Sequence, residues 1–375
     1  MAYGVVNADK MTTSDGVSSS GLYGFKNRII NGAMDLSQRG TSSVSVSSTT
    51  QTFSVDRWWA SGQATDGVFT MQQTPSATET GYATRVGAGF TNYLAVTVTT
   101  ADTSIGATQR YYLAQRIEAF NTADLAWGTA NAKTVTLSFW AYSSLTGTFG
   151  GFIYNSAADY SYPFTYSIPT ANTWTQISVT IAPPTAGTWL GSTNGMGMQI
   201  GWSLGAGSTY LGTAGSWASA QYFGATGQTN VIGTNGATFY ITGVQLEKGS
   251  TATSFDYRPY GTELQLCQRY YAQMNSVGGY NSVFGAGYCD TSTAVKLYTP
   301  LPVQMRSAPT VTASAGNTFY VASTAGTACS AFTAQYATVN GISNQFTTTG
   351  QTAGQGTLMR DNNTTSAYIA ASAEL

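Results

Sequence analysis

The chain has 375 residues, of which only 8% are charged, and its formal net charge is −1. An ordinary soluble protein has about 25% charged residues, so this surface must be hydrated mainly by hydroxyl and amide groups. The near-neutral charge argues against nucleic-acid binding, which needs clustered lysine and arginine. The sequence contains no histidine, which removes the commonest general base and the commonest transition-metal ligand. We therefore expect neither enzymatic activity nor a cofactor or bound metal.

The cysteine spacing and the lengths of the apolar segments indicate in which cellular compartment the protein is made. Cys267, Cys289 and Cys329 are widely spaced and odd in number, which fits neither a disulfide framework nor a zinc site. We expect them to be reduced core residues of a protein made in a bacterial cytoplasm. The N-terminal segment has no basic stretch followed by an apolar one, so we expect no signal peptide. No apolar run is long enough for us to expect membrane insertion.

The N-terminal region is predicted to be an anchor. Residues 1–25 are polar and rich in turn formers, and such a segment cannot bury a core of its own. We expect an arm that docks on neighbouring subunits or another protein; the alternative is a terminal strand packed on its own domain. Asn31-Gly32 between Ile29-Ile30 and Met34–Leu36 predicts a β-hairpin. We assign residues 1–40 to this arm and hairpin.

The next region is predicted to be a β domain at residues 41–255. Apolar and polar residues alternate in short runs such as Tyr111–Ile117, Val135–Trp140 and Ile177–Ile181, separated by glycine and proline turns. Many short strands without helices are typical of a β-sandwich or jelly roll, so we predict an all-β fold. We interpret the pair Trp58-Trp59 as core aromatics; the alternative is an exposed platform for a sugar.

A strand is predicted to close this domain. Thr238–Leu246 carries bulky residues on both faces, which suits a strand that is covered on both sides. Simple alternation places Val244 and Leu246 on the face of Thr238, opposite Phe239 and Ile241.

A connector with a short helix is predicted at residues 256–275. Thr262 suits an N-cap with Gln265 as its capping-box partner. Leu264, Cys267, Tyr271 and Met274 follow at helical spacing, which predicts a helix of about a dozen residues. Further strands are predicted beyond it, including Ala294–Leu301, so we assign residues 276–375 to a smaller C-terminal β domain.

Three motifs together resemble a family of bacteriophage virion proteins. They are FKNRIINGAMDLSQRG (25–40), DRWW (56–59) and TFYITGVQLEKGSTATSFDYRPYGTELQLCQRYY (238–271). Members of this family are described as tail-fibre or receptor-binding proteins with jelly-roll domains like carbohydrate-binding modules. The resemblance runs roughly from Phe25 to the C-terminus.

The resemblance implies both an architecture and a location. The architecture is a jelly-roll β-sandwich followed by a short helix and a smaller C-terminal β domain. The location that it implies is a virion, without specifying the part of the particle; we expect the external surface, and the tail rather than the head. The implied partners are other copies of the chain in a homotrimer, other virion proteins bound through the arm, and host surface glycans.

Glycan binding is the predicted function of two aromatic clusters. Sugars stack on exposed rings and form hydrogen bonds with amides and carboxylates. The first cluster contains Tyr154, Asp159, Tyr160 and Tyr162; the second contains Trp202, Tyr210, Trp217 and Tyr222. The alternative is that these rings belong to the core or to a subunit interface, where tyrosine and tryptophan are also favoured. We expect no metal at Asp159, because calcium needs several oxygen ligands.

Two other functions are open. One is a capsid decoration or cement protein that braces the head. The other is a polysaccharide depolymerase, which would need a pair of carboxylates. No such pair stands out among the acidic residues, and the sequence shows no repeat of the kind that builds a long β-helix.

Overall fold

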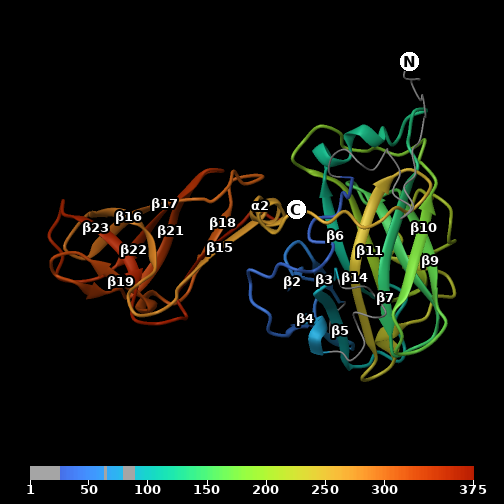
Figure 1. Cartoon of the computed structure of the whole chain (residues 1–375), viewed down its shortest axis with the longest axis horizontal. Coiled ribbons are helices and arrows are strands. Elements are labelled where there is room, and N and C mark those ends of the chain that lie inside the picture. Colours follow the sequence, from blue (N-terminus) through green and yellow to red (C-terminus); the bar gives the residue numbers. More distant parts are fainter. Residues whose placement is uncertain (1–25, 63–65, 79–88) are drawn as a thin grey trace, which may run out of the picture. The chain divides into compact units, whose positions relative to one another are not determined.

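The computed structural model describes residues 26–62, 66–78 and 89–375. The chain divides into two compact units, Met1–Pro259 and Tyr260–Leu375 (Figure 1). The predicted N-terminal arm at residues 1–25 lies outside the described residues, and the predicted connector at 256–275 is divided between the two units. Within the described ranges no helix has the length and apolar character needed to cross a lipid bilayer.

Unit 1 is a jelly-roll β-sandwich of two six-stranded antiparallel sheets, as predicted (Figure 1). The first sheet contains, in order, β1 (Val44–Val46), β4 (Val68–Pro75), β5 (Asn92–Thr100), β14 (Thr238–Lys248), β7 (Val135–Ser143) and β10 (Thr175–Ile181). The second contains β2 (Thr52–Phe53), β3 (Trp59–Ser61), β6 (Arg110–Glu118), β11 (Met196–Ala206), β8 (Gly147–Asn155) and β9 (Ser161–Ile168). Two short parallel strands, β12 (Leu211–Gly212) and β13 (Gly224–Ala225), form a separate ribbon.

The core of unit 1 lies between the two sheets. Alternate residues of each strand point inward, because successive side chains of a strand leave opposite faces. Trp58 is fully buried there, with its ring 5.5 Å from that of Trp202. Trp59 is also buried, against the ring of Tyr112. The core interpretation of the Trp58-Trp59 pair is confirmed, and an exposed sugar platform at that pair is excluded.

Strand β14 departs from simple alternation at a β-bulge. Its pairing with β7 shifts register between Thr242 and Gln245, where Gly243 has a φ of +61°. A bulge inserts one residue and exchanges the two faces beyond it. Val244 and Leu246 therefore join Phe239 and Ile241 in the core. The predicted strand and its burial are confirmed, but the predicted placement of Val244 and Leu246 is wrong.

The predicted hairpin at Asn31-Gly32 is also wrong, because residues 26–40 contain no strand. Asn31 adopts a φ of +57°, and its side chain donates to the carbonyls of Leu36 and Asp56. The backbone of this segment instead bonds β14: Arg28 N donates to Leu246 O at 2.9 Å, and Val244 N donates to Gly32 O at 2.9 Å. Tertiary bonds with β14 therefore replace the expected local turn, and residues 26–40 pack on the sandwich.

Unit 2 begins with the helix α2 (Tyr260–Gln268) and continues as two antiparallel sheets. The three-stranded sheet contains β15 (Tyr271–Asn275), β24 (Tyr368–Ser372) and β18 (Thr310–Ala313). The seven-stranded sheet contains, in order, β20 (Thr327–Ala328), β19 (Phe319–Ala322), β23 (Gly356–Asp361), β16 (Val283–Cys289), β17 (Ala294–Pro300), β22 (Gly341–Thr347) and β21 (Ala331–Ala337). The predicted smaller C-terminal β domain is therefore present.

The helix is shorter than predicted and starts earlier. It begins at Tyr260, so Thr262 lies inside its first turn and is not the N-cap. Tyr271 and Met274 belong to β15, which pairs with β24 through Tyr271–Ser372 and Met274–Ile369. Pairing with a strand nearly 100 residues later in the chain outweighs the local helical spacing, as tertiary context commonly does.

The core of unit 2 lies between its two sheets. Ile369 of β24 packs with Phe319, Phe346 and Met359 of the seven-stranded sheet. The three cysteines are free and buried, as predicted. Burial raises the pKa of the Cys329 thiol to about 12.

Candidate functional site

Five aromatic side chains meet at the end of the sandwich where β6, β8 and β10 finish and β7, β9 and β11 start. Four of them lie in four different connections between strands, and the fifth, Tyr162, lies at the start of β9. We call these five residues the end cluster: Trp127, Tyr160, Tyr162, Trp189 and Trp217. Residues from distant parts of the chain meet here because the jelly roll brings its loops together at this end. Loops on a rigid sandwich are common positions for binding residues.

Trp217 is the centre of the end cluster. Its ring stacks on that of Tyr160, with centroids 5.5 Å apart and an interplanar angle of 3°. Trp189 and Trp127 approach Trp217 edge to face, each at 5.5 Å, and approach one another at 4.8 Å. Offset stacking and edge-to-face packing are the favoured arrangements of aromatic rings, so the cluster is internally well packed.

Each of the three indoles is fixed by one hydrogen bond to a backbone carbonyl. The Nε1 groups of Trp127, Trp189 and Trp217 donate to Lys133 O at 2.7 Å, Ala186 O at 3.1 Å and Ala182 O at 2.7 Å. Because these donors are already satisfied, the half-buried Trp189 and Trp217 offer ring surface rather than N–H groups to a ligand, and Trp127, which is 6% exposed, packs behind them.

Asn155, at the end of β8, holds the turn that carries Asp159 and Tyr160. Its side chain is fully buried. Its Nδ2 donates to Asp159 Oδ1 at 2.8 Å and to Thr188 O at 2.9 Å, and its Oδ1 accepts from the backbone N of Asp159 and Tyr160. One amide therefore connects the β8–β9 turn to the loop that carries Trp189.

A bridge and a glycine bring Tyr160 against Trp217. Ser161 and Ala218 exchange backbone hydrogen bonds of 3.0 and 2.9 Å, which places Trp217 beside Tyr160. Gly187 has a φ of +84°, and a Cβ there would lie 2.8 Å from the Tyr160 ring. The Tyr160 ring therefore packs against both the Trp217 ring and the backbone of Gly187, and the absence of a side chain at Gly187 allows this close approach.

A cavity of about 180 Å³ opens beside the end cluster. Trp127, Trp189, Leu190 and Met198 supply its apolar lining, and Thr122 supplies a hydroxyl. Leu190 is 39% exposed, and Phe120, in the 3₁₀ turn η3 (Ala119–Asn121), is 55% exposed. Pockets for drug-sized ligands have about 300–1,000 Å³, so this cavity suits one small ring rather than a large ligand.

Charge near the cavity is neutralised within the protein. Asp124 contacts Arg28 at 2.8 Å and Lys248 at 3.1 Å. Partial burial raises the pKa of the Asp124 carboxyl, but the hydrogen bonds and charges of Arg28 and Lys248 outweigh that effect and lower the pKa overall. The cavity therefore favours a neutral ligand with an apolar face.

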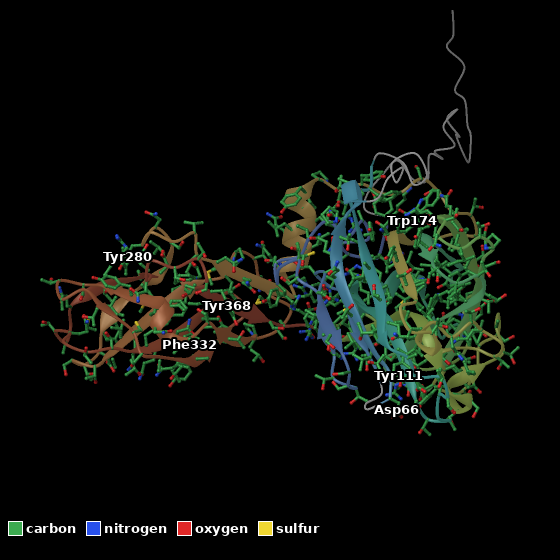
Figure 2. All side chains as sticks on the ribbon, turned by 90° about the horizontal axis from the view of Figure 1, so that it is seen from below. Asp66, Tyr111, Trp174, Tyr280, Phe332 and Tyr368 are labelled. Atoms are coloured by element: carbon green, nitrogen blue, oxygen red, sulfur yellow. The ribbon has the colours of Figure 1, made fainter. Side chains whose placement is uncertain are left out.

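A second cavity, of about 360 Å³, lies at the opposite end of β6 and β11. It is lined mainly by small and polar residues, among them Asp102, Ser208 and Asn230, with two aliphatic side chains and no aromatic one. The Asp102 carboxylate accepts a hydrogen bond from the Tyr111 hydroxyl at 2.9 Å, and Figure 2 shows Tyr111 at this end of unit 1 together with Asp66. The ring-lined cavity is the better candidate site.

The predicted site residues are partly brought together. Tyr160, Tyr162 and Trp217 join the end cluster, although they came from two separate clusters in the sequence, and Asp159 lies exposed beside them. Tyr162 is only 5% exposed and belongs to the core, so it supports the other rings and offers no surface to a ligand. Burial raises the pKa of the Tyr162 hydroxyl, an effect that a hydrogen bond with the Ala182 backbone opposes. Among the described residues no three cysteine, aspartate or glutamate side chains come together as a metal site requires.

Two predicted residues are unsuitable because they are buried elsewhere. Trp202 is fully buried between the sheets, with Trp58 and Phe139 against its ring. Tyr154 is 4% exposed and lies between Phe152 and Phe223 on the other side of the second sheet. Neither ring can be reached by a ligand, so we remove both from the candidate site.

Tyr210 and Tyr222 are partly exposed, and neither ring contacts a ring of the end cluster, although the backbone N of Tyr222 donates to Ser161 Oγ at 3.1 Å. The Tyr210 ring packs on Phe223 at 5.2 Å and lies beside the Arg110 guanidinium. The Tyr222 ring lies over Gly212, where a Cβ would come within 2.4 Å of it. Both therefore belong to the ribbon of β12 and β13.

Sequence reasoning missed Trp127 and Trp189. Both are tryptophans in glycine-containing segments without strand alternation, AWGTAN and GTWLGS. Strand alternation assigns neither tryptophan to the core. A tryptophan in a loop without such alternation is therefore a candidate site residue, and this signal could have identified both.

Comparison with known proteins gave structural similarities only. No protein-family model and no curated protein sequence matches the chain. The chain is similar to the enzymatically active domain of tailspike protein 4 of bacteriophage CBA120, at 12% identity and a TM-score of 0.30, over 60% of this chain and 21% of that chain. This chain thus corresponds to about a fifth of the tailspike chain.

Two further similarities are to carbohydrate-binding modules. One is the family 11 module of a cellulosomal cellulase from Clostridium thermocellum, at 11% identity and a TM-score of 0.25, over 55% of this chain and 99% of that chain. The other is the N-terminal cellulose-binding domain of β-1,4-glucanase C from Cellulomonas fimi, at 15% identity and a TM-score of 0.23, over 44% and 82%. At these TM-scores the similarities carry no argument about function, which must come from the site.

Proposed function

We propose that the end cluster binds a neutral sugar and that the chain is a phage virion structural protein that attaches to glycans of the host surface. The observation that carries the proposal is the cavity lined by Trp127 and Trp189 beside the stacked pair Tyr160–Trp217. The C–H face of a pyranose is apolar and its rim is polar, so it matches a ring-lined, uncharged cavity with a hydroxyl at its edge.

The place in the particle is proposed from the sequence motifs. FKNRIINGAMDLSQRG, DRWW and the stretch at 238–271 resemble phage tail-fibre proteins, so we propose a tail fibre or other tail appendage, assembled as a homotrimer and exposed on the tail. The N-terminal arm would bind other virion proteins. The alternative is a capsid decoration protein. The low surface charge would suit that role equally well, but the role would leave the end cluster without a ligand.

Sugar binding is tested with the full chain on an array of neutral bacterial surface oligosaccharides. Trp189→Ala removes one wall of the cavity, and we expect it to abolish the binding seen with the wild type. Trp140→Ala is the matched control, because Trp140 is a partly exposed tryptophan of unit 1 outside the cavity. Equal binding by the wild type and Trp189→Ala would refute the site.

The position in the particle is tested by gold-labelled antibodies on intact virions. Label on tails is the expected result, and label on heads alone would favour the decoration protein. We also propose that the chain is not an enzyme. Incubation with the bound oligosaccharide should then release no product, whereas cleavage that depends on carboxylates of this chain would show a depolymerase.

A further inference from the structure

Unit 2 carries a row of exposed side chains on one face of its seven-stranded sheet. Leu358, Ala286, Tyr298, Ser343 and Tyr336 lie opposite one another across the adjacent strands β23, β16, β17, β22 and β21. Residues opposite one another in neighbouring strands leave the same face of a sheet. Tyr336 is 76% exposed, Tyr298 56% and Leu358 37%. We call this surface the tyrosine face.

The tyrosine face is the outer face of unit 2. The neighbouring residues of the same strands, Leu297, Ile342 and Met359, point into the core between the two sheets. Tyr288, two residues from Ala286, adds a third ring to the outer face and is 46% exposed. Contiguous exposed apolar surface of this kind is a recurrent feature of binding sites, whereas singly scattered rings need no explanation.

The rings of this face are placed to stack on a ligand. The hydroxyl end of Tyr298 lies against Gly341, where a Cβ would come within 2.3 Å of the hydroxyl oxygen. More than half of the side chain remains exposed. Tyr336 is two strands away, which is about 10 Å at the usual strand spacing. That separation corresponds to two linked pyranose rings.

One cation on this face has no acidic partner. Arg360, two residues from Leu358, lies between Tyr320 and Val283 in the strand register. Among the described residues it makes no ion pair, and its Nε is buried without a hydrogen-bond acceptor. By contrast, Lys296 on the same face contacts Asp290 at 3.0 Å. The tyrosine face therefore carries one uncompensated positive charge beside its rings.

The acid next to Arg360 in the sequence is engaged elsewhere. Asp361 is fully buried and accepts hydrogen bonds from the backbone N of Tyr280 at 3.0 Å and of Ser282 at 2.8 Å. These bonds fix the loop that carries Tyr280, whose ring contacts that of Tyr320 at 5.1 Å. Tyr280, labelled in Figure 2, is 41% exposed, and its contact with Tyr320, which is paired with Arg360 in the strand register, extends the aromatic surface at the Arg360 end of the row.

From this arrangement we propose that the tyrosine face binds a polysaccharide that contains uronic acids. Sugar rings stack on Tyr298 and its neighbours, and a carboxylate pairs with the Arg360 guanidinium in the planar, two-pronged geometry that arginine favours. The charge favours one class of ligand: an arginine without an acidic partner attracts an anion, and exposed rings on adjacent strands suit a sugar chain. This site is distinct from the end cluster and does not depend on the function proposed for it.

The test uses the full chain and fluorescent oligogalacturonate, with the fully methyl-esterified oligosaccharide as the uncharged probe. We expect the acid form to bind and the ester to bind at least about tenfold more weakly, the loss expected when one charge-assisted hydrogen bond is removed. We expect Arg360→Gln to weaken binding of the acid by the same factor. Lys296→Gln is the matched control, because it removes a paired charge from the same face, and it should bind normally.

Four results would overturn the proposal. They are no binding of the acid by the wild type, equal binding of acid and ester, equal losses in Arg360→Gln and Lys296→Gln, or unchanged binding in Tyr298→Ala. If Tyr298→Ala instead changes the oligomer mass in sedimentation equilibrium without affecting saccharide binding, the face is a subunit contact. Trp189→Ala should leave oligogalacturonate binding intact, which separates this site from the end cluster.

Discussion

The end cluster of unit 1 and the tyrosine face of unit 2 present aromatic rings in two different ways. In the end cluster, rings from four separate connections pack on one another, and hydrogen bonds such as those of Asn155 hold the connections together. On the tyrosine face, single rings stand on adjacent strands and their order follows from the strand register.

The difference concerns how each surface is stabilised. The end cluster depends on contacts between segments far apart in the sequence, so one substitution can displace several rings. The tyrosine face depends on the pleat of a sheet, so a substitution there should affect one ring and leave the rest in place. Four substitutions test this comparison, with the two glycine variants taken as a pair, from the largest expected effect on stability to the smallest.

Asn155→Ala should have the largest effect. It removes a fully buried amide and leaves the carbonyl of Thr188 and the backbone N of Asp159 and Tyr160 without their partner. We expect the free energy of unfolding to fall by about 2–3 kcal/mol and sugar binding at the end cluster to be lost. Chemical denaturation measures the first effect. Asn235→Ala, at an exposed turn, is the control, and an equal loss in both variants would contradict the role of Asn155.

Gly187→Ala and Gly341→Ala form a matched pair, one for each surface. At Gly187 the φ of +84° strains any side chain, and the Cβ would meet the Tyr160 ring, so we expect a loss of about 1–2 kcal/mol. At Gly341 the Cβ meets only the hydroxyl end of the exposed Tyr298 side chain, which can swing away, so we expect less than about 0.5 kcal/mol. Thermal unfolding measures both losses of stability. Similar losses in the two variants would contradict the proposed difference in how the two surfaces are stabilised.

Among the substitutions near the end cluster, Asp124→Asn should have the smallest effect. Since its ion pairs lower the pKa of its carboxyl below the ordinary 3.8, they stabilise the fold above that pH and are lost as the pH falls through the lowered pKa. The carboxylate side chain is 50% exposed, so the contribution should be less than about 1 kcal/mol. Asp124→Asn should therefore reduce stability slightly at pH 7 and equal the wild type at about pH 2, as followed by urea denaturation. A difference that grows as the pH falls would contradict this assignment.

Much of the fold could be predicted from the sequence, because strand periodicity is local. Val135–Ser143 and Thr175–Ile181 are paired strands where alternation predicted them. The failures occurred where a distant segment determines the conformation. The bulge at Gly243 exchanges the faces of β14, and β24 draws Tyr271 and Met274 into a strand.

The candidate site was predictable only in part, for the same reason. Tyr160 and Trp217 could be selected by residue type, but their contact depends on the bridge between Ser161 and Ala218. Trp127 and Trp189 lie in non-periodic loops, so no local pattern placed them beside Trp217. Trp202 and Tyr154 were selected by the same aromatic density, which does not distinguish a buried ring from an exposed one.

The most direct test of the central claim is a tryptophan-fluorescence titration of the full chain with the oligosaccharide that the wild type selects from the neutral array. We expect a saturating change in fluorescence for the wild type and for Trp140→Ala, and no change for Trp189→Ala under conditions in which circular dichroism shows that this variant is folded. A titration of Trp189→Ala that matches the wild type, or a wild type that selects no sugar, would contradict a sugar site at the end cluster.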